Sequence, residues 1–309
     1  MAEKNQEIVI PDPNCLSAAT QEAKAETVGI GKTNLETSRC FALAIMAGIQ
    51  IGLGALLMLF VKSDSSLSFA VSQVLGGVCF SVGLICVIVA GSELFTGNNL
   101  MIIARLSGKI SWGGLFKNWV IVWVGNLVGS LVLVAIVFFC NSAGMNSENV
   151  GTAMVSVATS KINLPWTTIF FRGILCNVLV CLAVWMGFAG KSVVDKIFTS
   201  VFPVMAFVAC GFEHCVANMF FLPMGLAAYT AGFGADVANA ATCLNVTGIL
   251  YNISAATLGN IVGGALIVGC IYWIAYHKKA AVKPDFGSKK GRFTSDELVK
   301  LPFSHVYFL

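Results

Sequence analysis

The stretch GSELFTGN, residues 91–98, places a carboxylate in the second half of a long apolar run. A second stretch, GFEHCVAN at residues 211–218, has Gly, Glu and Asn at the same spacing and also lies within an overlong apolar run. An ionisable residue inside a membrane costs about 2.5–3.5 kcal/mol on insertion scales and usually lines a water-filled path or has a partner. The duplication of this pattern therefore indicates function or pore architecture rather than helix packing alone.

The composition supports a membrane protein. The chain has 309 residues, of which 57% are hydrophobic and 11% are charged, whereas soluble domains carry roughly a quarter charged residues. The apolar runs extend almost from end to end, so we expect one transmembrane domain, residues 38–277, between a cytoplasmic N-terminal segment, residues 1–37, and a cytoplasmic tail, residues 278–309. The formal charge of +4 is modest and does not indicate nucleic-acid binding.

Six membrane crossings are predicted from the apolar runs. Two of them are too long for a simple span and contain the duplicated pattern, which predicts a broken helix in each. The six runs are Phe41–Val61, Ala70–Ala104, Asn118–Cys140, Trp166–Ala189, Ile197–Ala228 and Ile249–Tyr276.

The two halves of the chain correspond to each other. The sequence GNLVG at residues 125–129 matches GNIVG at residues 259–263, each following its own copy of the first pattern. Three spans per half is an odd number, so the second half must enter the membrane the other way up, and substrate sites in such inverted repeats lie near the midplane. For these Gly-Asn pairs, helix packing is the favoured interpretation.

The distribution of basic residues predicts the orientation. Most of the lysines and arginines outside the spans fall on the side of the two termini, whereas Lys62 and Lys161 fall on the opposite side. The positive-inside rule therefore places both termini in the cytoplasm.

Four ionisable residues lie within the predicted spans: Glu93, Arg172, Glu213 and His214. We interpret the two glutamates as buried acceptors for backbone N–H groups freed by the helix breaks, and Arg172 as the partner of an acid or of a helix C-terminus. A pore role is favoured for His214. No metal site is expected there, because a lone histidine without clustered ligands cannot complete a coordination shell.

Several segments together resemble the formate/nitrite transporter family. They are GSELFTGNN at residues 91–99, FRGILCNVLVCLAVWM at residues 171–186 and GFEHCVAN at residues 211–218. The resemblance covers residues 38 to about 276. It implies an all-α, aquaporin-like six-span protomer with an inverted repeat, assembled as a homopentamer in a plasma (inner) membrane with a pore in each protomer. It implies neither a cofactor nor enzymatic activity.

The resemblance also implies roles for individual residues. Thr96 and His214 would face each other at the pore centre, and Lys161 and Asn177 would form a polar vestibule. Gly91, Glu93, Asn98, Gly211, Glu213 and Asn218 would support the helix breaks. The apolar constrictions would consist of Phe80, Val180 and Phe207 on the outer side, and of Leu84 and Leu94 on the inner side.

The expected function is transport of a small monovalent anion, with formate first and nitrite or hydrosulfide as the alternative. Lys161 would attract the anion, and desolvation would favour its neutral, protonated form, which can pass apolar rings. With a reference pKa of about 6.5, His214 could exchange a proton or supply compensating charge. Protons and membrane lipid are thus expected partners, although passage of the intact anion would use the same residues.

Two other classes of protein fit less well. A neutral-solute pore of the aquaporin type predicts Asn-Pro-Ala motifs at both breaks, and neither break has one. A membrane enzyme would need a catalytic constellation, and the sequence offers no nucleophile with an adjacent base and no phosphate loop.

Overall fold

The structure is a computed structural model that describes residues 15–277. The predicted cytoplasmic tail, residues 278–309, lies outside the described residues. Within them the chain is helical, and the prediction of an all-α membrane protein is confirmed. The helices are α1 (Ala18–Asn34), α2 (Thr37–Lys62), α3 (Phe69–Ala90), α4 (Phe95–Asn98), α5 (Ile102–Leu106), α6 (Trp112–Phe139), α7 (Asn149–Ile162), α8 (Trp166–Ala189), α9 (Val193–Ala209), α10 (Cys215–Thr230), α11 (Ala240–Cys243), α12 (Val246–Ile261) and α13 (Ile271–Tyr276).

Five helical segments are long and apolar enough to cross a membrane on their own: α2, α3, α6, α8 and Val246–Tyr276. The last of these runs from α12 through a π-helical stretch, Val262–Cys270, into α13. The sixth crossing is made in two parts, α9 and α10, on either side of residues 210–214. Large apolar side chains remain exposed along these helices, including Phe171 and Ile136, as expected where lipid or another subunit replaces water.

Both overlong runs are interrupted at the duplicated pattern. The helix α3 ends at Gly91, whose φ of 82° lies in the left-handed region, and the chain is extended until α4 begins at Phe95. From there a short 3₁₀ turn connects α4 to α5. In the second half, Gly211 has a φ of 68° and follows the end of α9. Glycine adopts such angles without the steric cost that a side chain would impose.

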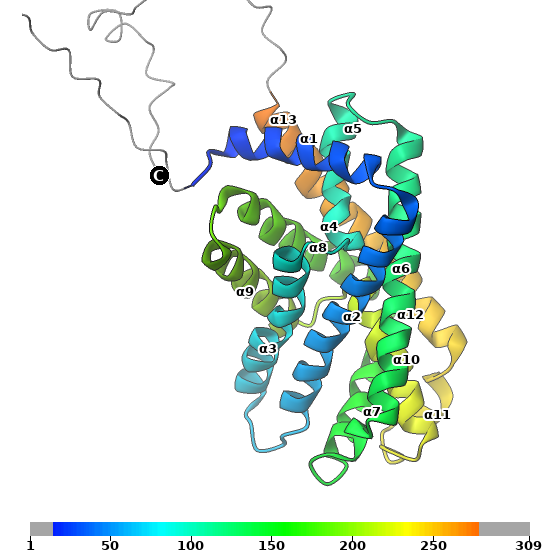
Figure 1. The fold of residues 1–309 in the computed structure, drawn as a ribbon. Coiled ribbons are helices and arrows are strands. Elements are labelled where there is room, and N and C mark those ends of the chain that lie inside the picture. The colour runs from blue at the N-terminus through cyan, green and yellow to red at the C-terminus, as the bar shows by residue number, and fades with distance from the viewer. Residues whose placement is uncertain (1–14, 278–309) are drawn as a thin grey trace, which may run out of the picture. The chain divides into compact units, whose positions relative to one another are not determined.

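Each half begins with a helix that lies outside the repeat predicted from sequence. In the first half this is α1, and in the second half it is α7, which occupies the segment before the fourth span. Figure 1 shows α1 lying across one end of the helix bundle, beside α13, while α7 lies at the opposite end. The repeat is therefore a set of four elements: α1, α2, α3–α5 and α6 correspond to α7, α8, α9–α10 and α12.

The Gly-Asn motifs bring these helices into backbone contact. A Cβ atom built on Gly129 would lie 2.0 Å from the carbonyl oxygen of Ile45, and one built on Gly263 would lie 2.2 Å from that of Ile174. Only glycine fits at such distances. The packing role expected for these glycines agrees with where they lie: Gly129 lies between α6 and α2, and Gly263 lies between the π-helical stretch after α12 and α8.

Candidate functional site

The two helix breaks are held by a pair of fully buried asparagines, one in each Gly-Asn motif. The Asn126 side-chain oxygen accepts from the Phe95 backbone N–H at 3.0 Å, and its amide donates to the backbone carbonyls of Ala44 and Glu93 at 2.7 and 2.9 Å. The bonds to Phe95 and Glu93 satisfy groups that the break leaves without helical partners, and the bond to Ala44 joins the break to α2. The sequence analysis assigned this motif to packing alone and so missed the role of its asparagine.

The second break is held in the same way. The Asn260 side-chain oxygen accepts from the Cys215 backbone N–H at 2.9 Å, and its amide donates to the carbonyls of Gly173 and Glu213 at 2.8 and 2.9 Å. Each of the three bonds made by Asn126 thus has a counterpart in the other half. The signal that could have revealed this is the position of both asparagines in matching, apolar helix segments, where an amide needs partners.

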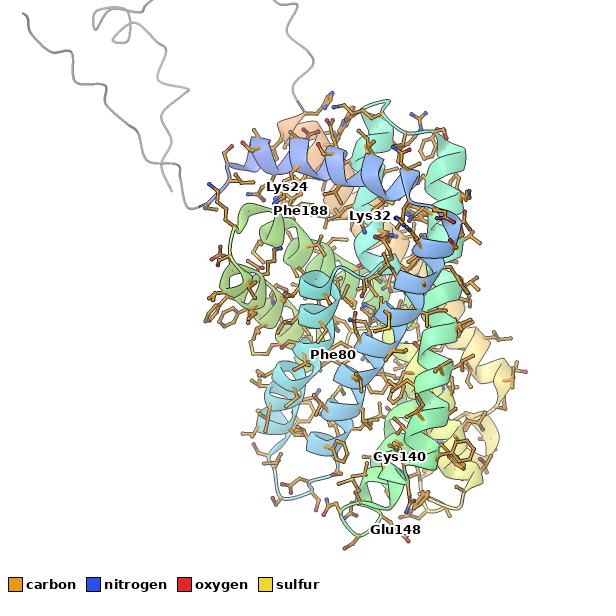
Figure 2. All side chains as sticks on the ribbon, viewed as in Figure 1. Lys24, Lys32, Phe80, Cys140, Glu148 and Phe188 are labelled. Carbon is orange, nitrogen blue, oxygen red and sulfur yellow. The ribbon has the colours of Figure 1, made fainter. Side chains whose placement is uncertain are left out.

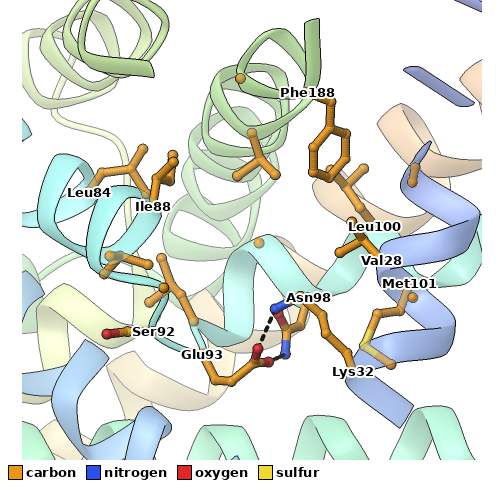
Figure 3. A pocket seen from close by; sticks show the side chains of 18 of the residues that line it. Val28, Lys32, Leu84, Ile88, Ser92, Glu93, Asn98, Leu100, Met101 and Phe188 are labelled. Atoms are coloured by element: carbon orange, nitrogen blue, oxygen red, sulfur yellow. Dashed lines mark hydrogen bonds and ion pairs between the residues drawn. The ribbon is translucent and has the colours of Figure 1, made fainter. Parts of the chain in front are cut away.

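The two buried glutamates bind lysine and asparagine side chains rather than the backbone N–H groups that we expected. The Glu93 carboxylate accepts from the Lys32 ammonium at 2.6 Å and from the Asn98 amide at 2.7 Å. Both hydrogen bonds are charge-assisted, and such bonds are about twice as strong as those between neutral groups. Figure 3 shows Glu93 and Asn98 joined in this way, with Lys32 reaching toward them from α1.

Glu213 has the equivalent set of partners in the other half. Its carboxylate accepts from the Lys161 ammonium at 2.9 Å and from the Asn218 amide at 2.6 Å. The family resemblance places Lys161 in a vestibule without pairing it with Glu213, and Lys32 has no role in the site predicted from sequence. Lysine side chains near the ends of α1 and α7 are therefore built into the helix breaks.

A cavity of about 300 Å³ lies beneath α1, and we call it the α1 cavity. Among residues 15–277, its charged side chains are Lys24, Lys32 and Lys196 against the carboxylate of Glu93, so these side chains make it positive overall. Leu84 and Leu94, the predicted inner constriction, line its wall. Figure 2 shows Lys24 and Lys32 on α1, with Phe188 near Lys24.

A second cavity, of about 340 Å³, lies against α7, and we call it the α7 cavity. Its charged side chains are Lys62, Lys161 and Arg172 against the single carboxylate of Glu213, so it too is positive overall. The Arg172 guanidinium donates to the carbonyl of Gly211 at 3.3 Å, just beyond the end of α9.

The two cavities share no lining residue, and a short apolar barrier separates them. Phe80 lines the α7 cavity, and Leu84, about 6 Å further along α3, lines the α1 cavity. Phe80 and Phe207 meet edge to face with ring centroids 5.7 Å apart. Phe80 and Phe207 thus lie together on the α7 side, and Leu84 and Leu94 lie together on the α1 side.

A polar pair lies at this barrier: His214 lines the α7 cavity, and Thr96, which lines neither cavity, lies next to it. Nε2 of His214 is 3.1 Å from Oγ1 of Thr96, and both side chains are buried. Nδ1 of His214 accepts a hydrogen bond from the backbone N–H of Ala217 at 3.0 Å, as the cap of α10. An Nδ1 atom that accepts a hydrogen bond carries no proton of its own. The imidazole is therefore in the neutral form with its proton on Nε2. That proton points toward Thr96.

The remaining predicted residues lie behind the barrier. The Asn177 amide is fully buried and lies 3.3 Å from the carbonyl oxygen of Thr96 and 2.7 Å from that of Asn260. It does not line the α7 cavity, although the resemblance placed it beside Lys161. Val180 is buried one turn further along α8 and lines neither of the two cavities.

An inverted-repeat membrane bundle with two positive cavities and an apolar barrier between them is the architecture of an anion pore, and comparisons with known proteins agree with this class. The family model of the formate/nitrite transporters matches residues 20–274. The chain is 36% identical over 269 residues to the formate channel FocA of Escherichia coli (strain K12), a match that covers 84% of this chain and 94% of that protein. It is 38% identical over 255 residues to the formate channel FocA of Haemophilus influenzae, covering 79% and 89%.

Solved structures lead to the same family. A pentameric formate channel with formate bound superposes with a TM-score of 0.71 at 39% identity, covering 78% of this chain and 98% of that one. An ion channel of the same family superposes with a TM-score of 0.73 at 30% identity, covering 83% and 98%. The chain belongs to the formate/nitrite transporter family, whose members are transporters and channels rather than enzymes.

Proposed function

We propose that the protein is a channel for small monovalent anions, with formate as its substrate, and that permeation is assisted by protons. The observation that carries the proposal is the matched excess of positive charge in the two cavities, where three cations face one carboxylate on each side of the barrier. Such cavities concentrate anions and repel cations. Relatives and a solved neighbour that are formate channels support formate.

The barrier determines what can pass between the cavities. An anion that leaves the Lys161 side must give up water before it reaches Phe80 and Phe207, and desolvation favours the neutral acid. The neutral His214 and the Thr96 hydroxyl then offer hydrogen bonds at the centre of an otherwise apolar path. In this account the substrate carries the proton, and His214 acts as a hydrogen-bond donor.

The residues behind the barrier have a positioning role in this proposal. Asn177 holds the Thr96 segment against α12 through its amide, and Val180 extends the apolar wall. Glu93 and Glu213, with Asn98 and Asn218, anchor the two breaks, while Gly91 and Gly211 permit them.

We further propose that the protein is a homopentamer in a plasma (inner) membrane with both termini in the cytoplasm. The exposed apolar flanks described above support contact with lipid and with neighbouring subunits, and the solved neighbour is pentameric. The excess of basic residues on the side of the termini supports the orientation.

The test is uptake of labelled formate into proteoliposomes, scanned over external pH, with unlabelled nitrite, hydrosulfide and lactate as competitors. We expect labelled formate to enter faster at acid pH. We expect lactate to inhibit formate uptake less than nitrite or hydrosulfide does. Faster entry of nitrite or hydrosulfide, with formate excluded, would support the alternative of a nitrite or hydrosulfide channel. If no anion enters at any pH, the proposed function is wrong.

A further inference from the structure

A cluster of ionisable side chains lies outside the pore, where α1 meets the end of α13. Glu22 and Glu26 are one turn apart on α1 and are both buried, and His277 directly follows α13. One ligating atom from each of these three residues lies within 4.8 Å of the other two. The transport mechanism uses none of them.

The imidazole of His277 is held in place before any ligand arrives. Its ring stacks on that of Trp273 with centroids 5.1 Å apart and an interplanar angle of 22°. The Trp273 indole N–H donates to Oγ of Ser107 at 2.9 Å, and that hydroxyl lies 3.3 Å from Nδ1 of His277. The stacking and the hydroxyl contact fix the direction of Nδ1.

More oxygen atoms converge on Nδ1 of His277 than one N–H can satisfy. Oε1 of Glu22 lies 3.2 Å from it, and Oε1 of Glu26 lies 3.3 Å from it. The Oε1 atom of Glu26 is buried and has no hydrogen-bond partner. The Lys109 ammonium binds the other oxygen, Oε2, of Glu26 at 2.5 Å, and Oε1 faces Nδ1 of His277.

The charge of the cluster also favours a cation. Two carboxylates face one ammonium, that of Lys109, so with a neutral imidazole the cluster has a net negative charge. A divalent ion would offset the repulsion between the two carboxylates without disturbing the Lys109 pair.

We propose that Glu22, Glu26 and His277 form a binding site for a divalent transition-metal ion of the zinc type. Zinc binds imidazole nitrogen and carboxylate oxygen atoms, and open zinc sites combine three protein ligands with a water molecule. Metal–ligand bonds of about 2.1 Å at tetrahedral angles place neighbouring ligand atoms about 3.4 Å apart. The two distances to Nδ1, 3.2 and 3.3 Å, are close to that value.

The metal would join two parts of the chain that are far apart in sequence. Ala25, Val28 and Lys32 of α1 line the α1 cavity, and the cluster lies on the same helix. A metal bound by Glu22, Glu26 and His277 therefore fixes α1 to the end of α13 and holds one wall of that cavity. The bound metal would therefore act as a structural clamp that holds α1 in place at the mouth of the pore.

The experiment is zinc titration by isothermal calorimetry of the full chain in detergent, after removal of purification tags and treatment with a chelator. We expect one zinc ion per chain. His277→Gln and Glu22→Gln each weaken binding by at least about tenfold, as even outer-shell partners of a metal contribute that much. Glu36→Gln, which makes the same change in an exposed carboxylate, leaves binding unaltered.

A second measurement separates the clamp from adventitious zinc. Hydrogen exchange of the α1 backbone slows with zinc in the unmodified protein and in Glu36→Gln, and does not slow in His277→Gln. Absence of stoichiometric zinc binding, equal binding by His277→Gln, or binding without slower exchange in α1 overturns the proposal. All three readouts are independent of the substrate that the pore carries.

Discussion

Lys32 and Lys161 occupy equivalent positions in the two halves of the protein. The first lies 2.6 Å from the carboxylate of Glu93, and the second lies 2.9 Å from that of Glu213. Each lysine comes from the helix that opens its half, α1 or α7. The relationship shows that the peripheral helices belong to the repeat and supply the counter-charges of the helix breaks.

Replacing one of these lysines is expected to destabilise the fold. Lys161→Met leaves Glu213, whose side chain is 1% exposed, without its counter-charge, and breaking a buried pair from one side costs about 3–5 kcal/mol. We expect a lower unfolding temperature in detergent and slower anion uptake. The control is Arg39→Met, which removes a positive charge from an exposed ion pair with Glu36. An unfolding temperature equal to that of Arg39→Met would contradict the structural role of the pair.

The double variant Lys161→Met/Glu213→Gln is expected to recover most of the lost stability, because no buried charge remains. It is not expected to recover anion uptake, since the positive charge that attracts the anion is still missing. The comparison of unfolding temperature with uptake therefore separates the two roles of Lys161. Recovery of uptake along with stability would show that Lys161 acts only on the fold.

His214→Asn is expected to reduce permeation while the fold stays intact. Asparagine is a favoured helix N-cap, so its side chain can replace Nδ1 of His214 as acceptor of the Ala217 N–H. It is too short to reach Thr96. His214→Leu loses the cap and the polar contact together, and a lost cap costs about 1 kcal/mol. We expect both variants to show slow formate uptake and only His214→Leu to unfold at a lower temperature. Uptake by His214→Asn at the unmodified rate would contradict the pore role.

The asparagines of the Gly-Asn motifs are expected to be essential for the breaks. Asn126→Ala removes three buried hydrogen bonds, and each group left unpaired costs about 1–3 kcal/mol. Asn260→Ala is expected to have a similar effect, because its three bonds match. The control is Asn163→Ala, a change at an exposed residue that ends α7. Monodispersity and unfolding temperature in detergent measure the effect, and a stable Asn126→Ala protein would refute it.

The glycines in close helix contact are expected to tolerate no side chain. In Gly129→Ala the new methyl group would overlap the carbonyl of Ile45, so α2 and α6 must separate. Gly31→Ala, in α1, is the matched control because nothing lies within 4 Å of its Cβ position, and alanine favours a helix by about 1 kcal/mol. We expect Gly129→Ala to lower the yield of folded protein and Gly31→Ala to leave it equal or higher.

Much of the fold could be predicted because lipid imposes simple rules. The lengths of the apolar runs predicted the membrane spans, and the matched positions of Gly, Glu and Asn predicted where both helices break. The repeat was predicted only from α2 onward, because α1 and α7 share a structural position without a shared sequence pattern. Their correspondence depends on what Lys32 and Lys161 contact, and contacts between distant residues are not visible in one sequence.

The candidate site was predicted less completely. The pore-centre pair followed from family resemblance, whereas the asparagine and lysine partners of the breaks require three-dimensional neighbours. The two halves of the repeat also differ at the centre of the proposed pore. Leu94 precedes α4 and His214 precedes α10 at equivalent positions, and only the second is polar.

The matched cavities have a consequence for the direction of flow. In the proposed channel, an anion that enters from either side first meets a positive cavity and a helix break neutralised by a lysine–glutamate pair, so both mouths of the pore attract the anion. Under the proposed function, net flux then follows the anion and proton gradients and reverses when those gradients reverse.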